Sequence, residues 1–136
     1  MSYLNKYNIT LEKEDGTTVD VSLRLTTRKM IELKNKYHET ALQTLMGAID
    51  DPERLVDVLE ASLDWKGNQN PIKKGIDLAD LLAENDMLGM MGTQKLMTAI
   101  GRASNIFSED EREAIDSKAE ARMGKLFLTD EDEKNA

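Results

Sequence analysis

Apolar and polar residues alternate in two short stretches near the start of the chain, residues 7–12 and 17–25. Alternation with a period of two places one face of a β-strand on a core and the other face in water. Residues 13–16 join the two stretches, and Gly16 can supply the positive φ that a tight turn needs. The pattern predicts an N-terminal β-hairpin whose apolar face comprises Ile9, Leu11, Val19, Val21 and Leu23.

A two-stranded hairpin is only marginally stable by itself, so the helices that follow must cover it. Thr26 or Thr27 can cap the first of these helices. Its apolar residues recur at steps of three and four, and we expect the hairpin to pack on them: Met30, Leu33, Tyr37 and Ala41. A second apolar set lies on a shifted face, which predicts a bend at residues 38–40, and comprises Leu42, Leu45, Met46 and Ile49.

The clearest helix start is the sequence Asp50-Asp51-Pro52-Glu53, which offers an aspartate cap, proline in the first turn and an acidic residue at the positive end of the helix dipole. One apolar stripe follows: Leu55, Val58, Leu59, Ser62 and Leu63. Residues 66–71 have the glycine, amide and proline composition of an exposed loop. After it, Asp77 is expected to cap a short helix that carries Leu78, Leu81 and Leu82.

Glycines and methionines blur the helical period between residues 86 and 92, and a regular period returns up to Phe107. Ser108 followed by Glu111 matches a capping box and predicts a last helix through about Met123. The acidic end of the chain cannot bury a core and is expected to be disordered. We therefore predict one α+β domain over residues 1–123, a β-hairpin packed on a mostly helical bundle, followed by an acidic tail over residues 124–136.

Composition narrows the class of protein further. The chain has 136 residues, of which 40% are hydrophobic and 32% charged, which suits one compact domain. Its net charge of −8 repels a phosphate backbone, so nucleic-acid binding is disfavoured. It has no cysteine, no apolar leader and no apolar run of the roughly 20 residues that a membrane span needs. These features indicate a protein of a reducing cytosol.

Few residues suggest chemistry. A nucleophilic serine or threonine needs a base, and the one histidine, His38, lies in a polar stretch typical of a solvated helix surface. No His, Cys or carboxylate spacing matches a metal site, and no glycine-rich loop follows a strand. Asp50 and Asp51 are better explained as a helix cap than as an acid/base pair. We expect no catalytic residue, no cofactor and no metal.

Two features are candidates for partner binding. Met87, Leu88, Met90 and Met91 form a glycine-flanked methionine segment, and methionine suits an adaptable contact surface as well as a core. Trp65 ends a strong helix just before a polar loop, where a tryptophan serves either as an interface anchor or as a lid over its own core. For both features the core is the simpler interpretation, and partner contact is the alternative.

The order of these elements resembles the tail assembly chaperones of long-tailed phages and prophages of Gram-positive bacteria. The resemblance spans about residues 7–107. Most of it lies in the hairpin, in the following helix with Leu33 and Tyr37, and in the helix that ends at Asp64-Trp65.

The resemblance implies a non-enzymatic helper that binds the tape measure protein, keeps its long helix soluble and helps to recruit tail tube subunits. It also implies a location in the cytoplasm of the bacterial host and absence from the mature virion. An acidic chain with apolar contact residues suits that task, because apolar faces provide affinity while charge resists co-aggregation. The oligomeric state stays open, with a homo-oligomer as one option.

The alternative is a small acidic regulatory adaptor, of the antirepressor or anti-restriction type, that occupies a basic protein partner. Gene context separates the two, since a chaperone gene should lie between genes for a tail tube protein and a very long helical protein. A hydrolase would need a base other than His38, and the sequence offers no nucleophile–base pair.

The resemblance further implies a longer product made by programmed ribosomal frameshifting. Gly124-Lys125, or the Lys125-Leu126-Phe127 that follows, lies after the last helical pattern, so a change of frame there would leave the folded domain intact. We predict that the gene carries a slippery run of repeated bases between about the codon of Met123 and the stop codon, with an overlapping downstream frame. The nucleotide sequence tests this, and absence of both features would mean that the chain is either a single-product chaperone or not a chaperone at all.

Overall fold

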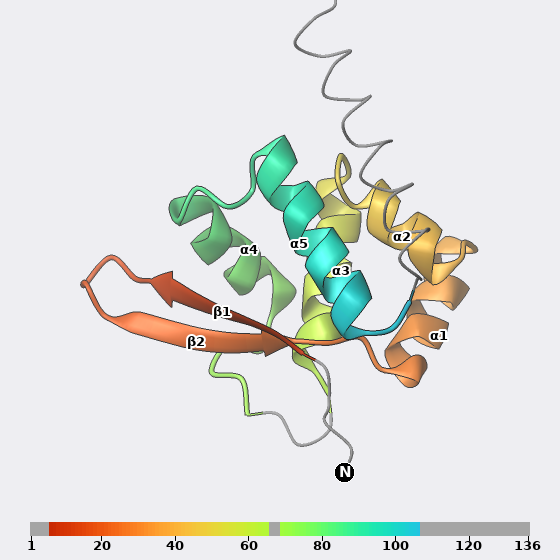
Figure 1. Ribbon diagram of the computed structural model, residues 1–136, viewed down its shortest axis with the longest axis horizontal. Coiled ribbons are helices and arrows are strands. Elements are labelled where there is room, and N and C mark those ends of the chain that lie inside the picture. The colour runs from red at the N-terminus through yellow and green to blue at the C-terminus, as the bar shows by residue number, and fades with distance from the viewer. Residues whose placement is uncertain (1–5, 66–68, 107–136) are drawn as a thin grey trace, which may run out of the picture.

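The computed structural model describes residues 6–65 and 69–106 and shows an α+β fold (Figure 1). An antiparallel hairpin comes first, and five helices follow within the described residues. The elements are β1 (Tyr7–Glu12), β2 (Thr18–Leu23), α1 (Thr27–Tyr37), α2 (Ala41–Gly47), α3 (Pro52–Leu63), α4 (Gly75–Glu84) and α5 (Met90–Ala103). The predicted fold class, a hairpin packed on a mostly helical bundle, is confirmed.

The hairpin follows the predicted alternation. Its register pairs Ile9 with Val21 and Leu11 with Val19, and Gly16 adopts the positive φ of 85° that the turn requires. All five apolar residues expected on one face are buried: Ile9, Leu11, Val19, Val21 and Leu23.

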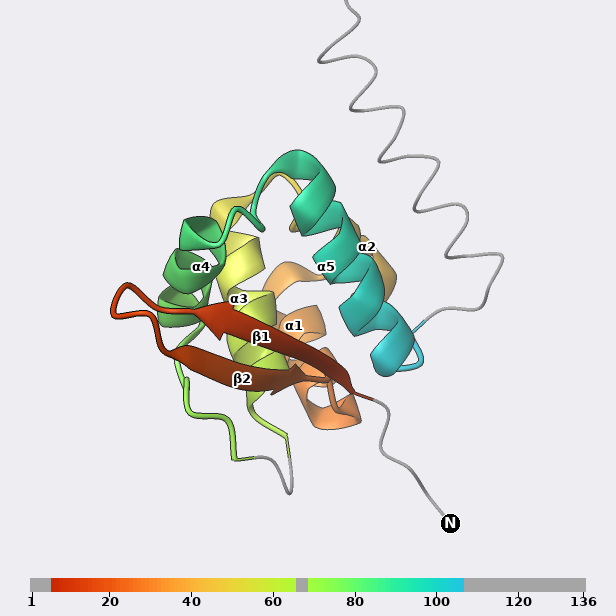
Figure 2. The same ribbon diagram turned by 60° about the vertical axis from the view of Figure 1, so that its left-hand side comes forward.

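The helices under this face differ from our expectation. Strand β2 packs against α3, and β1 packs against α4 and α5, whereas α1 packs chiefly on α2 and α3. Figure 1 shows α1 and α2 together at the end of the molecule away from the hairpin turn, and Figure 2 shows α3 behind the two strands. The physical reason is apolar area: the predicted α3 stripe of five residues is wholly buried, while Leu33 is the only buried residue of α1.

The helix starts and the bend follow local sequence rules. The Thr26 hydroxyl accepts from the Lys29 amide at 3.2 Å and caps α1, and the predicted bend begins at His38, which ends α1 at a φ of 56°. Thr40 forms a capping box with Gln43 at the start of α2. Asp51 caps α3 through the amides of Glu53 and Arg54.

The start of α4 differs from the prediction. The helix begins at Gly75, and Asp77 lies inside its first turn rather than at the cap. The side chain of Glu60, from α3, accepts a hydrogen bond from the Gly75 amide at 3.1 Å. A Cβ atom at Gly75 would lie 2.2 Å from the Val56 carbonyl oxygen, so close contact between α3 and α4 requires glycine here. A long-range contact therefore replaces the local cap that the sequence indicated.

Two asparagine side chains hold the outer edges of the hairpin. Asn70 accepts from the Ser22 amide at 2.7 Å and donates to the Ser22 and Leu63 carbonyls at 2.8 and 2.9 Å. Asn85 accepts from the Glu12 amide and donates to the Glu12 carbonyl, both at 3.0 Å. Each asparagine side chain gives one acceptor and one donor to the main chain of an outer strand edge, which are the hydrogen bonds that a further strand would make there. Side chains from two loops therefore satisfy edges that would otherwise need a third and a fourth strand.

None of the helices in residues 6–65 and 69–106 combines the length and the apolar run that a membrane crossing requires. The predicted last helix, the acidic tail and the boundary at residue 123 lie outside the described residues.

We predict that Asn70→Asp destabilises the fold by about 3 kcal/mol, because a buried carboxylate replaces an amide that donates to two carbonyl oxygens. Asn8→Asp is the matched control. Asn8 is exposed and pairs with Ser22 across the hairpin. Its side-chain oxygen accepts a hydrogen bond from the Ser22 hydroxyl at 2.7 Å, and an aspartate oxygen can accept the same bond. The control should change stability by less than about 0.5 kcal/mol. Urea unfolding measures both, and equal losses would contradict the role of the Asn70 amide.

Candidate functional site

A groove of about 540 Å³ lies between α1 and α3. Its lining includes the buried side chains of Leu33, Leu63 and Trp65, and the half-buried Ala61. Charged side chains from both helices and from the loop before α4 complete the lining: Lys29, Glu32, Lys36, Asp57, Glu60, Asp64 and Lys73. The α1–α3 groove therefore combines apolar contact with charges of both signs.

Two ion pairs cross the groove from α1 to α3. The Lys36 ammonium lies 2.5 Å from an Asp57 carboxylate oxygen, and the Lys29 ammonium lies 3.1 Å from an Asp64 oxygen. The two partners on each helix are seven residues apart, which is two helical turns. Hydrogen bonding to the Asp64 carboxylate raises the pKa of Lys29, and hydrogen bonding to the Asp57 carboxylate raises the pKa of Lys36. Both amines are therefore held in the charged form.

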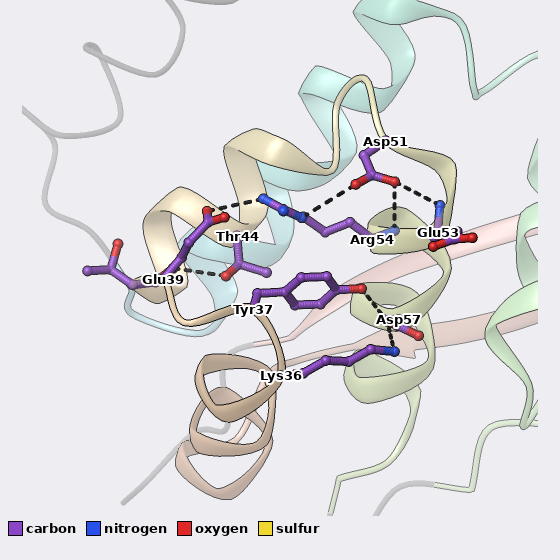
Figure 3. A network of polar contacts seen from close by, with 9 residues as sticks. Lys36, Tyr37, Glu39, Thr44, Asp51, Glu53, Arg54 and Asp57 are labelled. Carbon is purple, nitrogen blue, oxygen red and sulfur yellow. Dashed lines mark hydrogen bonds and ion pairs between the residues drawn. The ribbon is translucent and has the colours of Figure 1, made fainter.

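Arg54 organises the polar network at one end of the groove (Figure 3). Its guanidinium lies 3.1 Å from a Glu39 carboxylate oxygen, 3.7 Å from an Asp51 oxygen and 4.6 Å from the centre of the Tyr37 ring. A Cβ atom at Gly47 would lie 2.1 Å from an Arg54 nitrogen, so the guanidinium also packs on the end of α2. Arg54 thus links α2, α3 and the end of α1.

Tyr37 joins this network to the groove. Its hydroxyl donates to the same Asp57 oxygen that pairs with Lys36 (Figure 3). Burial of the side chain, together with the hydrogen bond to the anionic Asp57, raises the pKa of Tyr37 well above its ordinary value. The phenol therefore stays protonated and acts as a donor. These residues offer fixed charges and hydrogen bonds, and no deprotonated amine or phenol.

The sequence-predicted binding residues lie in two separate places. Trp65 is 8% exposed and its indole donates to the Ser22 carbonyl at 3.0 Å, so the lid interpretation describes it best, although it also lines the α1–α3 groove. The methionine segment spans the end of the α4–α5 connection and the first two residues of α5. Met87 and Leu88 pack partly on the core, Met90 is half-buried, and Met91 is 53% exposed.

The structure does not bring Trp65 and the methionine segment together. Trp65 bonds to Ser22, near the open end of the hairpin. Asn85, two residues before Met87, bonds to Glu12 at the end that leads into the hairpin turn. The methionine segment is therefore a separate, partly exposed apolar surface.

The remaining candidates for chemistry have local roles. His38 is exposed and lies just after α1, where its amide donates to the Lys34 carbonyl at 2.7 Å. Asp51 is the helix cap that we expected, and it also pairs with Arg54. Within residues 6–65 and 69–106, no group of three or more histidine, aspartate or glutamate residues could hold a metal ion.

Sequence reasoning missed the network of Tyr37, Arg54 and Asp57. Tyr37 was assigned to an apolar face, but its hydroxyl faces α3. A signal did exist, because Glu53, Asp57, Glu60 and Asp64 recur at helical spacing while α1 carries lysines at a matching interval of seven. No protein-family model, curated protein or solved structure matches this chain.

We predict that Tyr37→Phe lowers stability at neutral pH by about 1 kcal/mol through loss of the bond to Asp57. The raised pKa means that folded Tyr37 keeps its proton above about pH 10, where unfolded tyrosine loses it. The unfolded state then binds fewer protons, so the stability contributed by Tyr37 is present below pH 10 and falls as pH rises further.

Urea unfolding between pH 8 and 11, read together with phenolate absorbance, checks this behaviour. The parent chain should lose more stability above pH 10 than Tyr37→Phe does. Tyr7→Phe is the matched control, because Tyr7 lies on β1, away from the network. A parallel decline of the parent and Tyr37→Phe would contradict the assignment.

Proposed function

We propose that this chain is a non-enzymatic tail assembly chaperone of a long-tailed phage or prophage, which binds the tape measure protein and helps to recruit tail tube subunits. It would act in the cytoplasm of the bacterial host and be absent from the mature virion. The proposal begins from the resemblance in element order, a hairpin followed by helices that end in Asp64-Trp65 and continue through α4 and α5.

The observation that carries the proposal is the methionine segment. Met87 and Leu88 lie between α4 and α5, and Met90 and Met91 begin α5. None of these four large apolar side chains is fully buried, and Met91 is 53% exposed. Gly89 and Gly92 flank Met90 and Met91. The backbone of Gly92 packs against that of Met87, since a Cβ atom at Gly92 would lie 2.4 Å from the Met87 carbonyl oxygen. A partly exposed set of flexible thioether side chains suits a partner helix whose apolar sequence varies along its length.

The chain's charge supports the same role. A net charge of −8 keeps a complex with an apolar helix from aggregating further. The regulatory adaptor would use that charge differently, as the main source of affinity for a basic partner. Salt therefore separates the two functions, because apolar binding survives high ionic strength while binding driven by exposed charges is screened.

We predict that co-expression with the tape measure protein of the same gene cluster increases the soluble fraction of that protein, and that the two co-purify at 0.5 M NaCl. Met90→Glu combined with Met91→Glu should reduce capture about tenfold or more, because charge replaces the apolar contact, while the thermal transition stays nearly unchanged. Pull-down and calorimetry measure these two effects.

Ile76→Glu is the matched control, because Ile76 on α4 is 51% exposed, nearly as exposed as Met91, and lies outside the methionine segment. It should leave capture unchanged. Capture that disappears in high salt but tolerates the methionine substitutions would favour the acidic adaptor. No capture at any salt concentration would contradict the chaperone function.

A further inference from the structure

Helix α1 is attached to the domain differently from the other long helices. Leu33 is its only buried residue, and Met30 and Tyr37 pack partly against the core. By comparison α3 and α5 each bury five residues. Ile31, in the middle of α1, is 54% exposed. Because apolar burial supplies most of the stabilisation of a packed helix, α1 is held more weakly than its neighbours.

Charge attraction supplies much of the remaining attachment of α1. The helix carries four basic residues, Arg28, Lys29, Lys34 and Lys36, and one acidic residue, Glu32. The acidic face of α3, which we define as Glu53, Asp57, Glu60 and Asp64, lies on its side towards α1. The two crossing ion pairs show that the helices run antiparallel, with a basic amphipathic helix lying on an acidic surface. Exposed pairs of this kind are weak and are screened by salt.

The contact between α1 and α3 is also incomplete. The α1–α3 groove leaves about 540 Å³ between them, over Leu33, Ala61 and Trp65. Within the described residues the Glu60 carboxylate forms no ion pair, although it accepts from the Gly75 amide. α1 therefore neither fills the surface of α3 nor neutralises all of its acidic face.

The segments on both sides of α1 are anchored independently of it. Before the helix, Leu25 is buried and its amide donates to the Ser104 hydroxyl at 2.8 Å. After it, α2 starts with its own capping box at Thr40 and buries Thr44 and Leu45. The chain on each side of residues 26–39 is therefore held by contacts that do not involve the acidic face of α3.

We propose that α1 is a displaceable strap, and that the acidic face of α3 beneath it is a docking site for a basic amphipathic helix of the partner protein. The properties of α1 define the occupant: apolar residues at positions i, i+3 and i+7, with lysine or arginine beside them. The partner helix takes the place of α1 and pairs with Asp57 and Asp64. This inference rests on the proposed function only for the identity of the partner, and the site itself is tested without it.

The first experiment uses a synthetic peptide of residues 26–38 as the probe. The chain lacks cysteine, so Glu32→Cys with Ala61→Cys introduces the only two thiols and keeps Asp57 and Asp64 in place. Both positions line the groove, one from α1 and one from α3, and a reducible bis-thiosulfonate cross-linker joins them across it. We expect the peptide to bind this variant before cross-linking, to be excluded after it, and to bind again after reduction. Equal binding by the open and the cross-linked chain would overturn the proposal, as would no binding by either.

The cross-linker needs a control that leaves α1 free. Thr10→Cys with Asp20→Cys places the same link across the hairpin, between residues that are paired in the register and exposed. That chain should bind the peptide equally before and after cross-linking. Loss of binding there would show that the cross-linker itself blocks the peptide, and would remove the support from the first result.

Charge variants test the same site without a cross-link. Lys29→Glu with Lys36→Glu weakens the strap, and should strengthen peptide binding about tenfold while α1 amides exchange hydrogen faster than those of α3. Lys13→Glu with Lys95→Glu makes the same change in net charge at exposed positions outside the groove and should have a much smaller effect. Equal effects of the two pairs would mean that net charge alone attracts the peptide, which contradicts a site on α3.

Capture of the tape measure protein separates this inference from the proposed function. If the cross-linked chain still captures that protein in full, the strap is wrong and the chaperone function stands. If no form of the chain captures it while the peptide results hold, the chaperone function fails and the docking site on α3 stands.

Discussion

The main-chain groups on the outer edges of the hairpin need partners, because a two-stranded sheet leaves both of its edges unpaired. Asn70 supplies one donor and one acceptor to Ser22, and Asn85 does the same for Glu12. Asn70 also reaches the Leu63 carbonyl at the end of α3, and Asn85 reaches the Leu81 carbonyl in α4. The two amides thereby tie each strand to a helix, and the position of the sheet over the bundle depends on them.

Helix α3 is the element that contacts most of the others, since it packs on β2, α1, α2 and α4. One side of α3 carries the buried stripe that covers β2. At Gly75 the backbone of α4 lies directly against the backbone of α3. The opposite charges of α1 meet its acidic face. The apolar stripe of α3 is therefore buried, whereas its acidic face is covered only by a helix that buries a single residue. This asymmetry makes α3 the rigid side of the groove and α1 the movable one.

The two proposed contact surfaces differ in the interaction that would hold a partner. The methionine segment offers apolar contact that tolerates salt, and the acidic face of α3 offers salt-sensitive contact that selects basic residues. A protein that holds a long amphipathic helix needs both properties, because apolar contact provides affinity while charge fixes which face of the helix is gripped. The chain's two surfaces lie on separate elements, so substitutions can remove either one alone.

The sequence by itself determined the elements whose signals are local. Alternation predicted the hairpin and its buried face, Gly16 the turn, and Thr26, Asp51 and Pro52 the helix starts, because caps and turns involve residues close together in the chain. Tertiary structure decided which helices lie under the sheet, since that depends on the total apolar area each offers. It also decided the start of α4, where Glu60 from another helix holds Gly75, and the pairing of Tyr37 and Lys36 with Asp57. Those contacts join residues fifteen or more positions apart, and no local pattern encodes which distant side chains will meet.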